Sequence, residues 1–221
     1  MPWASSLVGV FTMGKCTCTG YAKAYQYLLQ LTGINCAVVS GKATTPQGRR
    51  SHAWVIQECD GSYYYTDPTW GDCFDGNNKE YISHSYFCLS ESEIEKTHTI
   101  NHKEILPKCT ANKDNYFVKN NLLFSSYNRA DIKKALKSCV ENGKYYAELK
   151  FTNKSAYIDA NNELFKQGQI YYILSVMSLK NKNIGVKNIK YSNNDNLCII
   201  TIFFDKTNNW QMYILHNYNV I

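Results

Sequence analysis

The sequence predicts an α+β protein, in which one helix packs on an antiparallel sheet and a small C-terminal α+β domain follows. Three observations lead to this prediction. Apolar residues recur every three or four positions after Cys18, which is typical of an amphipathic helix. Strand-like segments with a strong turn signal follow between residues 35 and 66. Helical and strand-like segments then alternate to the end of the chain, so we expect two parts, residues 1–100 and 101–221.

The helix is expected to begin at Cys18, with Thr17 as its N-cap and Gly33 as the glycine that ends it. One apolar stripe runs along it, formed by Tyr21, Ala22, Tyr25, Leu28 and Leu29. In the first turn of a helix, unpaired backbone N–H groups and the positive end of the dipole stabilise an anion. A thiol in this position has a lowered pKa, and its thiolate is the reactive form.

Three strands are expected after the helix. Residues 35–41 form a short apolar run typical of a buried strand, and residues 42–50 are expected to be a polar loop. Residues 51–57 and 62–66 are strand-like, and the Asp-Gly pair between them is a preferred two-residue hairpin turn. An antiparallel pair of this length brings the start of its first strand close to the end of its second.

Cys18, His52 and Asp67 each lie in a short local signature, and they occur in this order. The signatures are Cys-Thr-Gly-Tyr-Ala, Ser-His-Ala-Trp and Thr-Asp-Pro-Thr-Trp. A thiol, an imidazole and a carboxylate are the components of a nucleophilic triad, in which the base takes the thiol proton and the acid orients the base. The hairpin brings His52 near Asp67, and the helix supplies the thiol. We therefore predict a catalytic triad.

These three blocks resemble the transglutaminase-like superfamily, a group of papain-like cysteine enzymes that includes transglutaminases, peptide N-glycanases and many bacterial proteins. The resemblance covers residues 8–72. It implies a papain-like or transglutaminase-like core, in which the nucleophile helix packs on an antiparallel sheet. It also implies that Cys18 is the nucleophile, His52 the general base and Asp67 the acid that orients the base.

Other residues near these blocks are candidates for binding substrate or shielding the site. Trp54 and Trp70 resemble the tryptophans beside the family's His and Asp, where large rings exclude water and strengthen the imidazole–carboxylate bond. Core packing is the other interpretation of the two tryptophans, and the two interpretations are compatible. Gly20 leaves room for backbone or substrate to approach the sulfur, and the Cys18 N–H is the natural first donor of an oxyanion hole.

Each member of the triad has another interpretation when it is taken alone. Cys18 could be an ordinary buried cysteine, His52 a packed histidine and Asp67 a turn acid before proline. Cys16 lacks the signature that follows Cys18, so we expect it to be structural. Its Cys-x-Cys spacing does not match zinc sites, although a redox partnership with the nucleophile stays open. The occurrence of all three signatures in order favours the triad.

Composition limits the other classes of function. The net charge is +6, but the basic residues are dispersed and the aromatic residues follow strand patterns, so no nucleic-acid partner is expected. No long apolar run or signal-peptide layout occurs, so we expect no membrane insertion and, for the chain as it stands, a cytoplasmic protein. The family usually has more helical structure upstream of its Cys. A missing N-terminal segment would make the protein secreted or cell-surface.

No metal or cofactor is expected. Residues 71–79 are acidic but do not match the calcium-loop pattern, so we predict a solvated turn there. The polar stretch 97–114 is the expected boundary between the two parts. The segments expected outside the helix and hairpin are a strand at 81–89, a capped helix at 90–96, strands at 115–125 and 145–151, helices at 129–142 and 157–180, and strands at 185–191, 197–205 and 210–215.

The predicted activity is acyl transfer through a thioester. Hydrolysis of a peptide, isopeptide or glutaminyl amide is favoured, because no feature indicates a dedicated site for an amine acceptor. Two alternatives stay open: a protein-crosslinking transglutaminase, and a non-catalytic protein- or glycan-binding module on the same fold. The expected partner is a protein or peptide substrate. The C-terminal part carries no catalytic motif, and we expect it to be structural or to present substrate.

Overall fold

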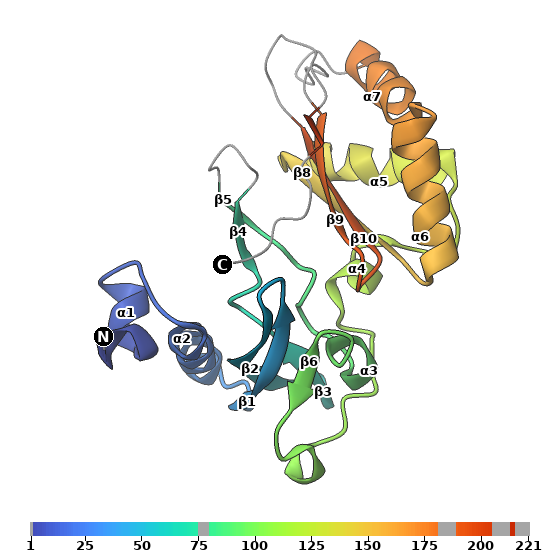
Figure 1. Cartoon of the computed structure of the whole chain (residues 1–221). Helices are drawn as coiled ribbons and strands as arrows, with labels where there is room; N and C mark the ends of the chain where they lie inside the picture. The colour runs from blue at the N-terminus through green and yellow to red at the C-terminus, as the bar shows by residue number, and fades with distance from the viewer. Residues whose placement is uncertain (1, 75–79, 181–188, 205–212, 215–221) are drawn as a thin grey trace. The chain divides into compact units, whose positions relative to one another are not determined.

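The structure is a computed structural model of the whole chain and describes residues 2–74, 80–180, 189–204 and 213–214 (Figure 1). Helices and largely antiparallel sheets are both present, which confirms the predicted α+β class. Internal contacts divide the chain into two compact units, one up to Tyr116 and one from Phe117 onward. The polar stretch in the sequence predicts a boundary at residue 100 instead.

The first unit begins with a 3-10 turn, η1 (Pro2–Ser5), and the short helix α1 (Leu7–Phe11). Helix α2 (Cys18–Leu31) follows and begins at Cys18, as the apolar stripe predicts. The chain leaves this helix through Gly33, whose φ of +79° lies in the left-handed region that favours glycine.

A four-stranded antiparallel sheet follows α2. Its strands are β1 (Cys36–Thr45), β2 (Gly48–Cys59), β3 (Ser62–Thr66) and β6 (His98–Ile100), in the order β3-β2-β1-β6. The Asp-Gly pair between β2 and β3 forms the predicted tight turn, with φ of 47° at Asp60 and 73° at Gly61. Both values are positive, as a type I′ turn requires.

The polar loop predicted for residues 42–50 is wrong, because β1 continues to Thr45 and β2 starts at Gly48. The alternation of a strand is present there, but most of its side chains are exposed. Lys42 and Thr44 are exposed, whereas Ala43 between them is buried. The exposed polar residues of this segment therefore resemble a loop in sequence, although they belong to a long hairpin.

Helix α2 packs on the sheet through small side chains. Buried Ala22 meets Ala53 and Val55 of β2, and half-buried Tyr25 and Leu29 extend the contact. Small residues at such a contact let the helix approach the sheet closely. Successive side chains of a strand point to opposite faces, so Trp54 lies on the face of β2 that is turned away from α2. It is completely buried there.

The rest of the first unit consists of short elements. These are β4 (Asp72–Phe74), β5 (Glu80–Ile82), α3 (Glu91–Ile94), the 3-10 turn η2 (Lys103–Ile105) and α4 (Tyr116–Lys119), which runs into the second unit. The loop predicted for 71–79 contains β4, which pairs with β5, and residues 75–79 lie outside the described residues. The strand predicted for 81–89 is wrong beyond Ile82, since Leu89 makes only a single bridge.

Two of the predicted features between residues 90 and 114 have different outcomes. The capped helix forms as α3, where the Glu93 carboxylate accepts the Ser90 N–H at 3.3 Å. The expectation that the whole stretch 97–114 lies between two parts is wrong, because His98–Ile100 is strand β6 of the main sheet.

Among the described residues, no helix is both long and apolar enough to cross a membrane.

The second unit is a mixed sheet with helices along one side (Figure 1). Its strand order is β11-β9-β10-β8-β7. Its elements are β7 (Leu123–Phe124), α5 (Arg129–Glu141), β8 (Tyr146–Phe151), α6 (Lys154–Asn161), a π-helical turn (Asn162–Lys166), α7 (Gln169–Lys180), β9 (Ile189–Asn194), β10 (Ile199–Phe204) and β11 (Tyr213–Ile214).

Most predictions for this unit are confirmed. Helix α5 forms with Ile132, Leu136 and Cys139 buried, and the helical stretch to residue 180 forms with a break at Gly168 (φ +68°). Strands β8 and β10 lie within their predicted segments, whereas β9 overlaps its segment from Ile189 and continues three residues beyond it to Asn194. Of the strand predicted for 115–125, only β7 (Leu123–Phe124) forms, and residues 116–119 belong to α4. Residues 185–188, 205, 210–212 and 215 of the last predicted strands lie outside the described residues.

Candidate active site

Cys18 occupies the first position of helix α2 and is half-buried. Thr17 holds the N-cap position, but its side chain makes no capping bond to the helix. Its hydroxyl lies instead 3.1 Å from the Ser5 hydroxyl and 3.3 Å from the Ala4 carbonyl oxygen. The N–H groups at the start of α2, including that of Cys18, therefore receive no side-chain cap from Thr17.

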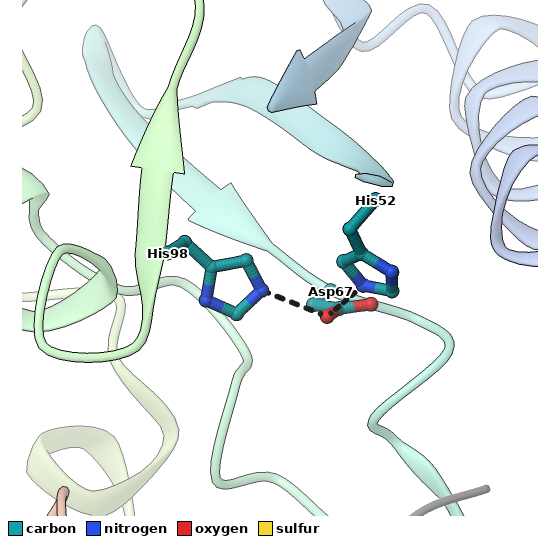
Figure 2. Close-up of side chains that lie close together, drawn as sticks. All are labelled: His52, Asp67 and His98. Carbon is teal, nitrogen blue, oxygen red and sulfur yellow. Dashed lines mark hydrogen bonds and ion pairs between the residues drawn. The ribbon is translucent and has the colours of Figure 1, made fainter. Parts of the chain in front are cut away.

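His52 on β2 and Asp67 just after β3 are hydrogen-bonded to each other. His52 Nε2 lies 2.7 Å from Asp67 Oδ2, and Figure 2 shows how the two side chains face each other. The Asp67 side chain is fully buried, and that of His52 is 9% exposed. The Cys18 thiol and the His52 imidazole also interact, and this interaction lowers the pKa of Cys18 and raises that of His52. Since Nε2 contacts Asp67, Nδ1 is the ring nitrogen that can exchange a proton with the Cys18 sulfur. The structure thus brings all three predicted triad residues together.

A second histidine, His98 on β6, contacts the same carboxylate oxygen. Its Nε2 lies 3.2 Å from Asp67 Oδ2, a contact that Figure 2 marks with a dashed line. Its Nδ1 lies 2.8 Å from the Thr97 hydroxyl. The side chain is fully buried. Sequence reasoning missed this residue because it assigned the segment to a polar linker. The alternation Thr-His-Thr-Ile, rich in β-branched residues, is the signal that could have indicated a short strand.

Gly41 explains how β6 comes close enough to deliver His98. In the register of the sheet, Gly41 pairs with Ile100 on one side and with His52 on the other. A Cβ atom on Gly41 would lie 2.0 Å from the Thr99 carbonyl oxygen and 2.7 Å from the Trp54 ring. Only glycine leaves room for both neighbours.

The Asp67 carboxylate accepts four hydrogen bonds. Oδ2 accepts from the two histidines, and Oδ1 accepts from the backbone N–H groups of Thr69 at 3.0 Å and Trp70 at 3.3 Å. Aspartate often bonds the backbone two residues further on in this way. Asp67 is therefore both a turn residue and the partner of His52.

The charges of the site favour an ionised thiol and a protonated imidazole. Burial alone would raise the pKa of Asp67, but hydrogen bonds from His52 and His98 outweigh it and hold this pKa below its ordinary value. Burial opposes protonation of His52, yet Asp67 and Cys18 together raise its pKa to about 9. The hydrogen bond from His52 lowers the pKa of Cys18 in spite of partial burial. Each shift favours a thiolate–imidazolium pair.

Aromatic rings enclose the two histidines. Trp54 stacks with His52 at 6.0 Å between ring centroids and meets His98 edge-on at 4.8 Å. Trp70 lies 5.7 Å from His52 and 4.6 Å from His98 between ring centroids, and it also meets the Tyr86 ring edge-on. Trp54 and Trp70 thus shield the imidazole–carboxylate bonds from water, which strengthens them.

The N-terminal segment fills the space beside Gly20. A Cβ atom there would lie 2.5 Å from the Ala4 carbonyl oxygen and 2.8 Å from the Cys16 Cβ. Gly20 therefore permits the backbone of the N-terminal segment to approach helix α2 closely. Cys16 is a free thiol whose pKa is raised, first of all by burial, so it differs from Cys18 in its electrostatics. Tyr21, one turn into α2, donates a hydrogen bond to Asp72.

His52, Asp67 and His98 are also the kind of group that can hold a metal, with ligand atoms within 4.8 Å of one another. The distances between these atoms fit hydrogen bonds better than they fit shared coordination of a metal ion. Tetrahedral zinc with bonds of about 2.0–2.1 Å separates its ligand atoms by roughly 3.3 Å. The 2.7 Å between His52 Nε2 and Asp67 Oδ2 is shorter than this, so an ion would have to push the two atoms apart.

Comparison of the sequence with protein-family models and with curated proteins finds no match.

Proposed function

We propose that this chain is a cysteine-dependent acyl-transfer enzyme built on a papain-like or transglutaminase-like core. The observation that carries the proposal is the hydrogen-bonded pair His52 and Asp67, with the Cys18 thiol at the first residue of a helix and interacting with His52. The lowered pKa of Cys18 and the raised pKa of His52 agree with it. An activated thiol beside an oriented base is the usual requirement for nucleophilic catalysis.

In the proposed reaction, the Cys18 thiolate attacks an amide carbonyl carbon, and the electron pair of the C=O bond moves to oxygen. His52 then gives its proton to the leaving amine as the C–N bond breaks and a thioester remains. Water, deprotonated by His52, attacks the thioester and releases the acid and the thiol. Asp67 keeps the proton on Nε2 of His52, so that Nδ1 can exchange protons with the sulfur and the substrate.

The start of helix α2 offers stabilisation for the oxyanion that forms in both steps. The Cys18 N–H has no partner one turn earlier in the helix, and the helix dipole is positive at this end. The Thr17 hydroxyl bonds Ser5 and Ala4 and makes no cap on the helix. We assign the Cys18 N–H as one donor of the oxyanion hole.

Two exposed polar residues lie on the strands next to the segment that Cys18 contacts. Cys18 packs against Ala53, and Ser51 lies on the same face of β2 two residues earlier. Ser51 and its cross-strand partner Lys42 are both exposed. A peptide approaching Cys18 along these residues would meet polar side chains and would not need to displace the hydrophobic core.

Hydrolysis is the favoured outcome, with water as the acyl acceptor. The direct test is turnover of a peptide library that includes glutaminyl peptides, with and without an added primary amine, followed by mass spectrometry. The parent should produce new termini or deamidated glutamine, Cys18→Ala should abolish both, and the matched control Cys16→Ala should keep most of the activity.

The same experiment separates the alternatives. Amine-linked products in place of hydrolysed ones would identify a crosslinking enzyme. Peptide binding by Cys18→Ala, with no turnover by the parent on any substrate, would identify a binding module instead and would contradict the proposal.

A further inference from the structure

His98 is a buried ionisable residue that the proposed triad mechanism does not use. Both of its ring nitrogens have partners: Asp67 Oδ2 at 3.2 Å from Nε2, and the Thr97 hydroxyl at 2.8 Å from Nδ1. Trp54 and Trp70 lie 4.8 and 4.6 Å from its ring centroid. A polar ring enclosed in this way and bonded at both nitrogens has a fixed orientation.

These contacts also determine where the proton of the neutral ring lies. The ionised Asp67 carboxylate can only accept, so the proton must be on His98 Nε2. Nδ1 then accepts from the Thr97 hydroxyl, which is closer to it than to the Ile94 carbonyl oxygen, at 3.4 Å. Asp67 therefore sets the tautomer, and the Thr97 hydroxyl complements it.

We propose that His98 is a positioning residue that holds the Asp67 carboxylate ionised and turned toward His52. Its catalytic consequence rests on the proposed function, but its effect on the Cys18 thiol does not require a known substrate. A fully buried carboxylate is unfavourable unless hydrogen bonds compensate for lost hydration. His98 supplies one of four donors to Asp67, and the only one besides His52 that reaches Oδ2 among the described residues.

The ionisable groups around Asp67 come from three elements. His52 on β2 and His98 on β6 donate to it directly, and Cys18 on α2 is coupled to it through His52. Tyr86, whose backbone carbonyl accepts the Asp67 N–H at 2.9 Å, presents its ring to His98. Without the His98 donor, the ionised form of Asp67 should become less stable. The His52 imidazolium should then lose part of its stabilisation, and the Cys18 thiolate should become less stable in turn.

The test is the pH profile of alkylation of Cys18 by iodoacetamide, mapped by peptide mass spectrometry in the full chain. His98→Phe keeps a ring in the aromatic enclosure but removes the donor. His98→Gln keeps an N–H near the position of Nε2. The control is His102→Gln, because His102 is a histidine with an 80% exposed side chain. The melting temperature of each variant is measured on the same preparation.

For His98→Phe we expect the pH at which Cys18 becomes reactive to rise by about one unit, the size expected when a hydrogen bond to a charged group is lost. His98→Gln should stay close to the parent, and His102→Gln should coincide with it. If His98→Phe does not fold, Thr97→Val tests the same idea, since it removes the hydroxyl that holds the His98 ring in place toward Asp67 and should shift the profile in the same direction.

A folded His98→Phe with the parent's profile overturns the proposal. So does a variant that lowers only the melting temperature, since that is the result of a purely structural role. The parent serves as an internal check. If Cys18 of the parent is not selectively reactive, the proposed function fails; if it is selective and His98→Phe leaves the profile unchanged, only the role of His98 fails.

Discussion

His52 and His98 donate to one oxygen atom, Oδ2 of Asp67, from two strands that lie on either side of β1. The carboxylate is thus held between a largely buried imidazole beside the thiol and a fully buried imidazole on the far side (Figure 2). This geometry gives Asp67 a fixed direction and a lowered pKa, and it makes the acid of the site unusually sensitive to substitution.

Asp67→Asn should preserve the fold but remove most of the activity. The amide oxygen can still accept from Thr69 and Trp70, but the amide nitrogen would then face two imidazole Nε2 atoms as a donor. His52 would favour the other tautomer, with its proton on the nitrogen nearer the sulfur. In comparable triads such a change lowers turnover about 10⁴-fold. Turnover and melting temperature should be measured together. A destabilised variant with a normal rate per folded molecule would remove Asp67 from the mechanism.

Asp67 should also contribute to stability in a pH-dependent manner. Its pKa is lower in the folded chain than its ordinary value, so the folded state binds fewer protons at this group than the unfolded state does. The resulting stability is present above the unfolded pKa of about 4 and is lost as the pH falls through the folded value. Urea unfolding of parent and Asp67→Asn should therefore give a difference that shrinks on acidification. A difference independent of pH would contradict the assignment.

Gly41→Ala should damage the site without touching any member of the triad. The added Cβ would lie 2.0 Å from the Thr99 carbonyl oxygen, so β6 would have to move and carry His98 with it. Overpacking of this kind costs about 1–3 kcal/mol. We expect a lower melting temperature together with slower Cys18 alkylation, whereas the exposed neighbouring substitution Ser40→Ala should change neither. Normal stability of Gly41→Ala would show that the strands can separate freely.

Local sequence was sufficient for part of the fold and of the site. The stripe after Cys18 defines α2, and the Asp-Gly turn aligns β2 with β3, so Cys18, His52 and Asp67 could be grouped without coordinates. Their signals are short-range ones: helix period, turn chemistry and the residue types beside each side chain. The α+β class follows from the same signals.

His98 could not be found in this way, because its role depends on a contact between residues far apart in the chain. Strand β6 has only three residues, and it joins the sheet because Gly41 leaves space for it. The polar residues before and after it are typical of a linker. Strand β8 is a related case: all six of its residues are buried, including Glu148 and Lys150, although its sequence alternates as in a half-exposed strand. In both strands, tertiary contacts determine the structure and the burial of side chains more strongly than the local sequence pattern does.

The central claim is that Cys18 is an activated nucleophile, and competition among the nine cysteines tests it most directly. The folded chain is treated at about pH 6 with a limiting dose of iodoacetamide, well below the pKa of an ordinary thiol, and the adducts are mapped. We predict that Cys18 carries most of the label, ahead of its half-buried neighbour Cys16, and that His52→Ala removes this preference. Label spread over several cysteines, or a Cys18 that reacts equally fast without His52, would contradict the account.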